Sequence, residues 1–189
     1  MKFSPTPLPG VQLIEPDVFA DPRGYFLESY HQTKYAVGGI RGPFIQANIS
    51  KSCKGTLRGL HAQLTHPQAK LVHIVLGEIW DVVVDIRPDS PTYRKWYGVT
   101  LSSEKPQQLY VPVGYAHGFC VESDTAIVEY KCTEVYDPSH ELHLMWNDPD
   151  IGIQWPVKDP VLSKKDQAGI SLRQAEPLLQ RHFATTKSK

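Results

Sequence analysis

The middle of the chain alternates short apolar runs with residues that form turns. The runs are rich in β-branched and aromatic residues and are bounded by Gly, Pro or Asp, a pattern typical of antiparallel strands. About ten strands at near-regular spacing predict an all-β sandwich or barrel. We expect these strands at 11–15, 24–30, 44–50, 56–63, 69–76, 78–86, 95–101, 107–112, 116–123 and 125–132.

Turn and helix signals complete this pattern. The "LGE" segment at 76–78 predicts a tight hairpin turn between two strongly apolar strands. Helical signals are weak before the C-terminal part, where Ser163 is a candidate N-cap and 171–180 is expected to form a short helix broken by Pro177. A further helical turn is expected at 31–38, and the last six residues are expected to fray.

Alternation along a strand assigns its side chains to faces, since neighbouring residues point to opposite sides. In the segment 44–50, Gln46 and Asn48 share a polar face that lies opposite a fully apolar one. This polar face borders either solvent or a polar cavity. By the same rule Tyr130 and Lys70 lie on the apolar sides of their strands, which directs both side chains inward.

Length, charge and cysteine content narrow the class of protein. At 189 residues the chain is long enough for one domain with its own core and too short for two. Twenty Lys and Arg residues balance twenty Asp and Glu residues, which argues against binding of nucleic acid by general charge. Three widely spaced cysteines, without a signal peptide or an apolar stretch of membrane-spanning length, predict a soluble cytoplasmic protein.

The segment "VPVGYAHGF" at 111–119 contains P-x-G-x-x-H, which resembles the second half-motif of the cupin superfamily of jelly rolls. Cupins that bind a metal usually carry an H-x-H pair in the first half-motif, and here Gln63 stands where the second histidine would be. A site of three imidazoles from His61, His73 and His117 stays open as an alternative.

Proton chemistry needs no metal if a base, an acid and a cation converge on the substrate. His61 suits the base, Tyr130 the acid and Lys70 the cation that stabilises an oxyanion. Arg58 lies three residues before His61, and an arginine beside a half-buried histidine suggests an anionic ligand. Each residue also has a structural interpretation, as a core aromatic, a surface ion pair or a hydrogen-bonded core histidine.

Six segments together resemble the dTDP-4-dehydrorhamnose 3,5-epimerase (RmlC) family, in order and with similar spacing from about residue 10 to 180. They are "DPRGYFLESY", "RGLHAQ", "QAKLVHIVLGEIWDVVVDIRPDSPTYRKWYGVTLS", "QLYVPVGYAHGF", "YKCTEVYDP" and "WNDPDIGIQWP". The resemblance implies a single cupin-type jelly-roll domain over 1–189, with short C-terminal helices. It also implies a homodimer that acts on a dTDP-linked 4-keto-6-deoxyhexose without a metal or another cofactor.

The resemblance also implies roles for residues. His61 would be the base that removes a proton beside the C4 ketone, with Asp166 as its carboxylate partner, and the enzyme would invert C3 and C5 of dTDP-4-dehydro-6-deoxy-D-glucose. Tyr130 would return a proton on the other face, and Lys70 would stabilise the enolate. Substrate and nucleotide binding would involve Phe19, Arg23, Phe26, Glu28, Gln46, Asn48, Arg58, Asp81, His117 and Tyr136.

Three positions depart from the family pattern. Ala62 stands where a bulky aromatic residue is usual, and a cavity or a repacked wall beside the sugar is expected to follow. Ala47 replaces a common acidic residue, and His73 a frequent arginine. The departure at Ala62 leaves the precise sugar open. The alternatives to this function are a mono-epimerase (C3 only or C5 only) on a related dTDP- or CDP-linked 4-keto-deoxysugar, a metal-dependent cupin, and a non-catalytic sugar-binding jelly roll.

Overall fold

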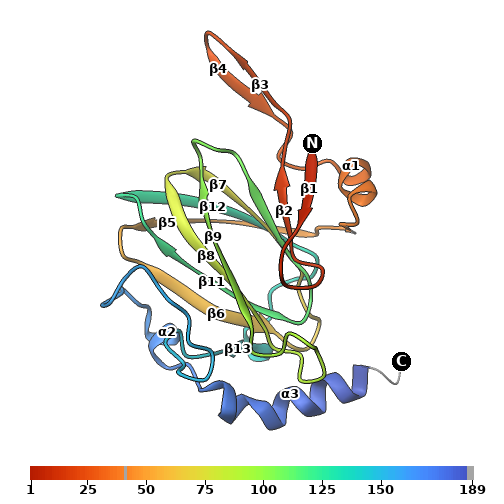
Figure 1. Cartoon of the computed structure of the whole chain (residues 1–189), viewed down its shortest axis with the longest axis vertical. Coiled ribbons are helices and arrows are strands. Elements are labelled where there is room, and N and C mark those ends of the chain that lie inside the picture. The colour runs from red at the N-terminus through yellow and green to blue at the C-terminus, as the bar shows by residue number, and fades with distance from the viewer. Residues whose placement is uncertain (41, 187–189) are drawn as a thin grey trace.

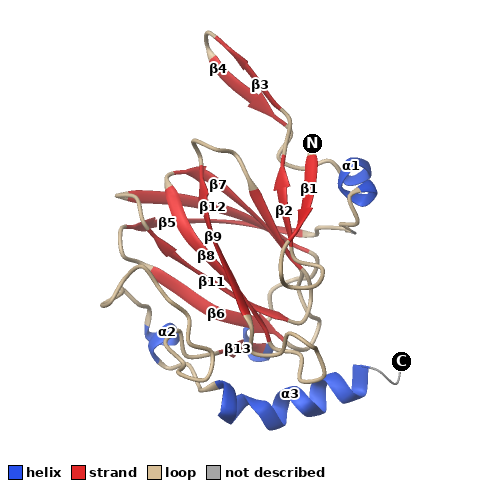
Figure 2. Cartoon of the chain, in the orientation of Figure 1, coloured by secondary structure: helices blue, strands red, loops and turns tan. Residues whose placement is uncertain are grey.

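Two antiparallel sheets face each other in the computed structural model, which describes residues 1–40 and 42–186 (Figures 1 and 2). One sheet has six strands in the order β1 (Lys2–Pro5), β2 (Gln12–Glu15), β10 (Gln108–Val111), β7 (Lys70–Leu76), β12 (Thr125–Cys132) and β5 (Gln46–Cys53). The other has the order β13 (Glu141–His143), β6 (Leu57–Gln63), β11 (Tyr115–Val121), β8 (Glu78–Asp85) and β9 (Trp96–Ser102). A separate hairpin joins β3 (Val18–Asp21) to β4 (Gly24–Leu27).

The predicted all-β fold is confirmed, and each of the ten expected runs contains a strand. Sequence reasoning missed β1, β3 and β13, which are only three or four residues long. The expected helical turn at 31–38 is α1 (Gln32–Val37). A short 3₁₀ helix at Pro138–His140 precedes β13, and α2 (Lys164–Gln167) begins after Ser163 as expected.

The hairpin predicted at 76–78 is wrong. β7 pairs with β10 and β12 in one sheet, whereas β8 pairs with β11 and β9 in the other, so Gly77 turns the chain from sheet to sheet. Gly77 has φ of +81°, and a Cβ there would lie 2.2 Å from the carbonyl oxygen of Thr125. Glycine is needed for close passage between the sheets, which local sequence cannot distinguish from a hairpin turn.

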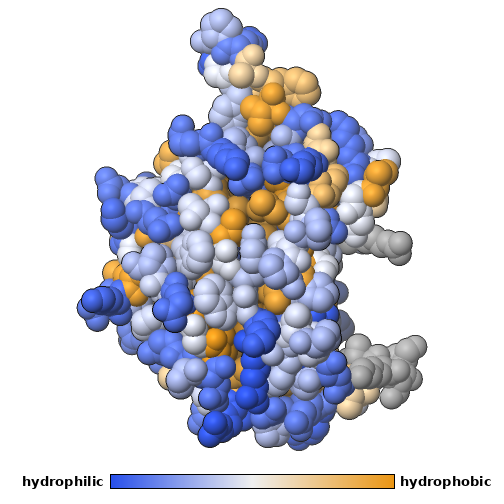
Figure 3. Space-filling model, viewed as in Figure 1, coloured by the Kyte–Doolittle hydropathy of each residue, from blue (hydrophilic) through white to orange (hydrophobic). Residues whose placement is uncertain are grey.

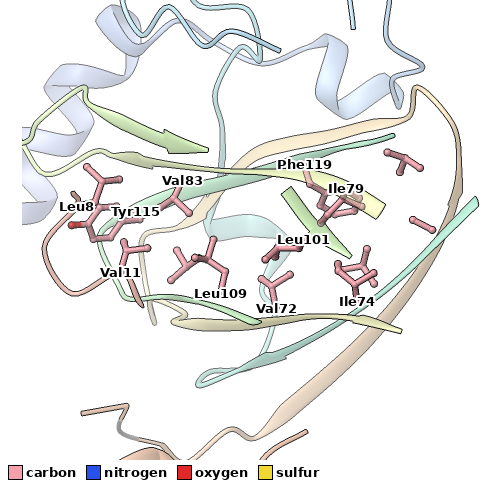
Figure 4. Packing of buried hydrophobic residues seen from close by; sticks show 14 residues of the cluster. Leu8, Val11, Val72, Ile74, Ile79, Val83, Leu101, Leu109, Tyr115 and Phe119 are labelled. Carbon is pink, nitrogen blue, oxygen red and sulfur yellow. The ribbon is translucent and has the colours of Figure 1, made fainter. Parts of the chain in front are cut away.

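The main hydrophobic core fills the space between the sheets (Figure 4). Val72, Ile74 and Leu109 project into it from the six-stranded sheet and meet Ile79 and Val83 from the other sheet. The core does not extend to one end of the sandwich, where polar side chains replace apolar ones on the same inner faces. This end is where a ligand can enter.

A second core lies on the outer face of the five-stranded sheet, under α3 (Leu172–Thr186; Figure 1). Leu172, Ala175 and Leu179 of α3 are buried there. The prediction that Pro177 breaks this helix is wrong, because α3 continues through it. Packing of its apolar stripe outweighs the missing backbone hydrogen bond of one proline, which sequence propensity alone cannot weigh.

The N-terminal part covers the outer face of the other sheet. Tyr35 of α1 is buried with Ile14 and Leu71, and its hydroxyl donates to Gln108 Oε1 at 2.6 Å. The β3–β4 hairpin instead stands away from the body of the molecule (Figure 2). The fraying expected at 184–189 is wrong for its first half, because α3 extends to Thr186, and residues 187–189 lie outside the described part. No helix among the described residues is long and apolar enough to cross a membrane.

Candidate active site

A cavity of about 400 Å³ opens at the polar end of the sandwich. Strands of both sheets line it, and the α2 segment borders one side. Most of the residues predicted for the site come together here. They are Gln46, Asn48, Arg58, His61, Lys70, His117, Tyr130, Tyr136 and Asp166.

An irregularity in β6 puts Arg58 and His61 on the same wall. His61 pairs with His117 of β11 and Arg58 pairs with Phe119, so three steps on β6 oppose two on β11. This is a β-bulge, which shifts the alternation of side chains by one residue. Gly59 has φ of +119° at the bulge, and a Cβ there would lie 2.6 Å from Gly118 Cα. Glycines on both strands therefore allow the contact that aims two polar side chains into the cavity.

His61, which is partly exposed to the cavity, pairs with the buried Asp166 on this wall. Their Nε2 and Oδ1 atoms are 2.6 Å apart. Asp166 is held at the start of α2, where its Oδ2 accepts from Ser163 Oγ at 2.6 Å and its Oδ1 accepts from the Gly59 N–H at 3.1 Å. Burial raises the pKa of Asp166, but the hydrogen bonds from His61 and Ser163 outweigh it and bring that pKa to about 2. The carboxylate is therefore ionised at neutral pH.

Tyr130 and Lys70 face the cavity from the six-stranded sheet, as alternation predicted. Burial raises the pKa of Tyr130, which keeps its phenol protonated at neutral pH. Burial also lowers the pKa of Lys70, and the nearby Cys132 thiol, Glu141 and Asp81 act in the opposite direction. A phenol donor and an amine thus lie on the wall opposite the His61–Asp166 pair.

The polar face of β5 is the inner one. Gln46 Nε2 donates to Asn48 Oδ1 at 2.9 Å, and Gln46 Oε1 accepts from the backbone N–H of Tyr136 at 2.8 Å. Arg58 Nε donates to Ser52 Oγ at 3.0 Å, which leaves other guanidinium nitrogens for a ligand. Amides and a guanidinium at one end of a cavity suit a nucleotide base and phosphate oxygens.

The structure does not bring His61, His73 and His117 together, which argues against the three-imidazole metal site left open as an alternative. His73 lies on the opposite face of β7 from Lys70 and does not line the cavity. His117 Nε2 lies 2.9 Å from both carboxylate oxygens of the fully buried Asp81. Asp81 thus supports His117 from beneath the cavity floor and does not line the cavity itself.

Gln63, in the place of the second cupin histidine, has a structural role. Its Nε2 donates to the carbonyl oxygens of His66 and Val135 at 2.6 and 3.0 Å, and its Oε1 accepts from the N–H of Asp137 at 2.9 Å. The side chain fastens the loop that precedes β13. All its partners are backbone groups, so its position carries no ligand.

Glu141, His143 and Lys165 also line the cavity, and sequence reasoning missed them. Glu141 and His143 lie on β13, where His143 pairs with His61 across the ladder. The rings of His143 and His61 meet edge to face with centroids 4.8 Å apart. The alternation in "ELHL", polar then apolar twice, was the available signal, because it marks a short strand with one polar face.

The four remaining predicted residues lie outside this cavity. Phe19 and Phe26 pair on the β3–β4 hairpin, and Arg23 lies at its tip with a side chain 90% exposed. Arg23 Nη2 lies 2.6 Å from Asp21 Oδ2 of the same turn. Glu28 follows the hairpin and pairs with Lys34 of α1. Within one chain these residues do not contribute to the pocket.

Ala62 does not border the cavity either, which corrects the expectation of a changed wall beside the sugar. It points into the second core and pairs with Leu142 in the ladder between β6 and β13. Adjacent residues of a strand face opposite sides, so the residue after His61 is turned away from the ligand. The side chain next to His61 in space is His143.

An inward-facing polar cavity at one end of a two-sheet jelly roll is the architecture of a cupin-type protein, here with a histidine–carboxylate pair facing a tyrosine. The profile of one family, described as dTDP-4-dehydrorhamnose 3,5-epimerase, matches residues 5–174. The chain belongs to this family.

Relatives agree with the family match. The chain is 50% identical over 177 residues to a dTDP-4-dehydrorhamnose 3,5-epimerase of Neisseria gonorrhoeae, covering 93% of this chain and 54% of that protein. It is 47% identical over 176 residues to the enzyme of that name from Methanothermobacter thermautotrophicus, covering 92% of this chain and 95% of the relative.

Solved structures give the same fold. The epimerase of Legionella pneumophila in complex with dTDP-4-keto-L-rhamnose superposes with a TM-score of 0.91 at 43% identity, covering 94% of this chain and 96% of the other. A 3'-monoepimerase of Streptomyces bikiniensis in complex with dTDP-quinovose superposes with a TM-score of 0.89 at 32% identity, covering 98% and 97%. Both regiochemistries thus occur on this fold.

Proposed function

We propose that this chain inverts C3 and C5 of dTDP-4-dehydro-6-deoxy-D-glucose to give dTDP-4-dehydro-L-rhamnose. The observation that carries the proposal is the placement of His61, with its partner Asp166 from α2, on one sheet and Tyr130 on the other, around one cavity. Inversion requires a proton to leave one face of the sugar and to return on the other. Acid–base groups on opposite walls meet this requirement.

His61 removes the proton in this mechanism. The ionised Asp166 can only accept hydrogen bonds, so Nε2 of His61 carries the hydrogen of their 2.6 Å contact. Nδ1 then keeps its lone pair and is the nitrogen that takes the substrate proton. Asp166 stabilises the imidazolium that forms, and Ser163 and Gly59 fix the orientation of the carboxylate.

Lys70 and Tyr130 complete the cycle. A proton beside a ketone is acidified when the oxyanion is stabilised where it forms, and the Lys70 amine supplies this stabilisation at the C4 oxygen. Tyr130 then gives its phenolic proton to the enolate from the opposite side. Solvent then takes the proton from His61 and reprotonates Tyr130. C3 and C5 both flank C4, so the same groups can serve each carbon in turn.

The nucleotide end of the site is assigned to Gln46, Asn48 and Arg58, whose polar groups face the cavity. Tyr136 and His117 line the same space, with Asp81 behind His117. Phe19, Arg23, Phe26 and Glu28 lie outside their own cavity, and we assign them to the cavity of a second copy in a homodimer. Aromatic rings and a guanidinium on a projecting hairpin suit a base and a diphosphate.

Exposed apolar surface supports the homodimer. Phe26 on the hairpin is 66% exposed, and Ile49 on the outer face of β5 is 70% exposed, with Ile45 and Val75 also exposed nearby in the sheet. Apolar residues also gather below the base of the hairpin (Figure 3). Apolar surface of this kind on a soluble enzyme marks an interface, and a two-fold pair would cover both sites alike.

Solvent-deuterium incorporation into dTDP-4-dehydro-6-deoxy-D-glucose tests the function. We expect label at both C3 and C5, and a fall of about 10²–10⁴-fold in its rate for His61→Asn, the usual contribution of a general base. Binding of dTDP should survive this substitution. Label at C3 alone would instead establish a mono-epimerase, and no label with any dTDP- or CDP-linked 4-keto-deoxysugar would leave a binding protein.

The compartment that we propose is the cytoplasm. Cys53, Cys120 and Cys132 are all free thiols, two of them buried, as expected in a reducing environment.

A further inference from the structure

Three groups that bind transition metals meet at one corner of the cavity. One nitrogen of His61, one nitrogen of His143 and one carboxylate oxygen of Asp166 all lie within 4.8 Å of one another. The epimerase mechanism uses His61 and Asp166 and leaves His143 without a role.

His143 is held in place for a ligand rather than for packing. Its Nε2 lies 3.0 Å from Glu141 Oε2, so a carboxylate fixes the ring from behind. Its Nδ1 is buried and has no hydrogen-bond partner among the described residues. A carboxylate behind an imidazole whose other nitrogen is unpartnered is the arrangement that orients histidine ligands in metal sites.

The donor set selects the class of ion. Two imidazoles and a carboxylate suit Zn²⁺ and its neighbours in the first transition row, whereas Mg²⁺ and Ca²⁺ prefer oxygen ligands. The three side chains would leave the fourth position of a tetrahedral ion open to the cavity. The carboxylate of Glu141 lies 3.0 Å from His143 Nε2 and 4.0 Å from His61 Nδ1, so a second acidic group adjoins both imidazoles.

The distances show what the ion must displace. His61 Nε2 and Asp166 Oδ1 are 2.6 Å apart, whereas two ligands of one tetrahedral Zn²⁺ lie about 3.3 Å apart. Asp166 is fastened by Ser163 and Gly59, so the adjustment falls on the His61 ring, which borders the open cavity. The metal therefore takes the place of the hydrogen between His61 and Asp166, and that hydrogen moves through solvent to Nδ1, so that the neutral imidazole binds through the lone pair of Nε2.

We propose that Zn²⁺ binds at His61, His143 and Asp166 as an inhibitor of the enzyme. Binding separates the base from its carboxylate partner and leaves a hydrogen on Nδ1, the nitrogen that would receive the substrate proton. The inhibition rests on the proposed epimerase function, whereas the binding of the metal does not.

Binding is measured on the whole purified chain, first stripped with a chelator, by competition for Zn²⁺ with a chromophoric chelator. We expect one Zn²⁺ per chain and a visible Co²⁺ spectrum of tetrahedral intensity. His143→Ala should weaken binding by at least about 100-fold, because even loss of an outer partner of a ligand costs about 10–100-fold. Glu141→Gln alters the outer partner of His143 and should weaken Zn²⁺ binding by about 10–100-fold.

His140→Ala is the matched control, because His140 pairs with Asp137 on the exposed surface next to β13 and lies outside the cluster. This variant should bind Zn²⁺ like the wild type. Circular dichroism and thermal unfolding without metal establish that His143→Ala is folded. Binding that survives both His143→Ala and His61→Asn, or that is lost in His140→Ala, would overturn the proposal.

Deuterium incorporation with and without Zn²⁺ separates this inference from the proposed function. Exchange that stops with one equivalent of Zn²⁺ and returns with chelator supports both the epimerase function and the inhibitory zinc site. Exchange unaffected by Zn²⁺ leaves the epimerase and overturns the inhibitory site. If no substrate shows exchange, the epimerase is wrong, and the binding assay still decides whether the three residues hold a metal.

Discussion

His61 and Tyr130 face one cavity from different sheets, His61 on β6 of the five-stranded sheet and Tyr130 on β12 of the six-stranded sheet. A planar enolate held between them has one face toward each residue. If Tyr130 is the acid, Tyr130→Phe should slow inversion by about 10²–10⁴-fold, because only the returning proton is lost. His61 can still remove and return a proton on its own face.

Tyr130→Phe should therefore change two measured quantities differently, the incorporation of label and the inversion of configuration. NMR in deuterium oxide should show label entering the substrate without a change of configuration, while the product with inverted carbons is nearly absent. If exchange and inversion fall together, Tyr130 is not the acid and instead contributes to binding or to removal of the proton.

Mixed dimers test whether the hairpin serves the neighbouring cavity. One chain carries His61→Asn, and the other carries Arg23→Ala with Phe26→Ala, each nearly inactive alone. A mixed dimer contains one cavity with an intact His61 and an intact hairpin from the partner. Random pairing should restore about a quarter of wild-type activity, since half of the dimers are mixed and each has one complete site.

Co-expression with two different tags and purification through both provides the mixed species. Activity no greater than the sum of the two parents would show that each hairpin serves its own chain or neither. Sedimentation velocity on Ile49→Lys checks the interface independently, and a shift toward monomer at micromolar protein is expected.

Lowering the pH should reveal how much the ionised Asp166 contributes to the free energy of unfolding. Its pKa is lowered from 3.8 to about 2 in the folded chain, so its ionised form stabilises the fold by about 2 kcal/mol at neutral pH. A lowered pKa means that this stabilisation is complete above about pH 4 and is lost as pH falls through about 2.

Urea unfolding of wild type and Asp166→Asn across this range measures the effect. The difference in free energy of unfolding should shrink as the solution is acidified. Asp137→Asn is the matched control, because Asp137 also has a pKa of about 2 but its side chain is 40% exposed, so that solvent screens its interactions. An Asp166→Asn difference that stays constant down to pH 2 would contradict the assignment.

Ala62 should affect the stability of the fold and not the selection of the sugar. It is buried in the second core opposite Leu142, so Ala62→Phe overfills that core and should cost about 1–3 kcal/mol. The KM for the sugar nucleotide should stay unchanged in the folded variant, as measured by initial rates below its melting temperature. A changed KM without a loss of stability would place the side chain beside the ligand after all.

The sequence predicted a feature correctly where that feature depends on residues that are close together in the chain. Alternation placed Tyr130 and Lys70 inward correctly, because both lie on regular stretches of strand. The same rule could not relate Arg58 to His61, because the bulge between them depends on how β6 passes β11. The resemblance alone supplied Asp166, which lies 105 residues from His61 in the chain.

Contacts between distant elements explain the remaining errors. Gly77 looked like a hairpin turn because its role, a passage between sheets, is decided by which strands pair. Pro177 looked like a helix end because the packing of α3 on the sheet was not visible in its own segment. His143 was missed since a strand of three residues gives almost no periodic signal.

The bulge at Gly59 also decides on which face of β6 the side chains of Arg58 and His61 in "RGLH" lie. A regular strand would turn residues three positions apart to opposite sides, and one inserted residue is what lets Arg58 and His61 serve the same ligand. A regular stretch of the same length would keep both functional side chains, yet would rotate one of the two out of the pocket. Deleting Gly59 or Leu60 would instead remove the bulge and leave Arg58 and His61 two positions apart, on the same face of a regular strand. The bulge, and not the residue spacing alone, therefore decides that both side chains share one wall.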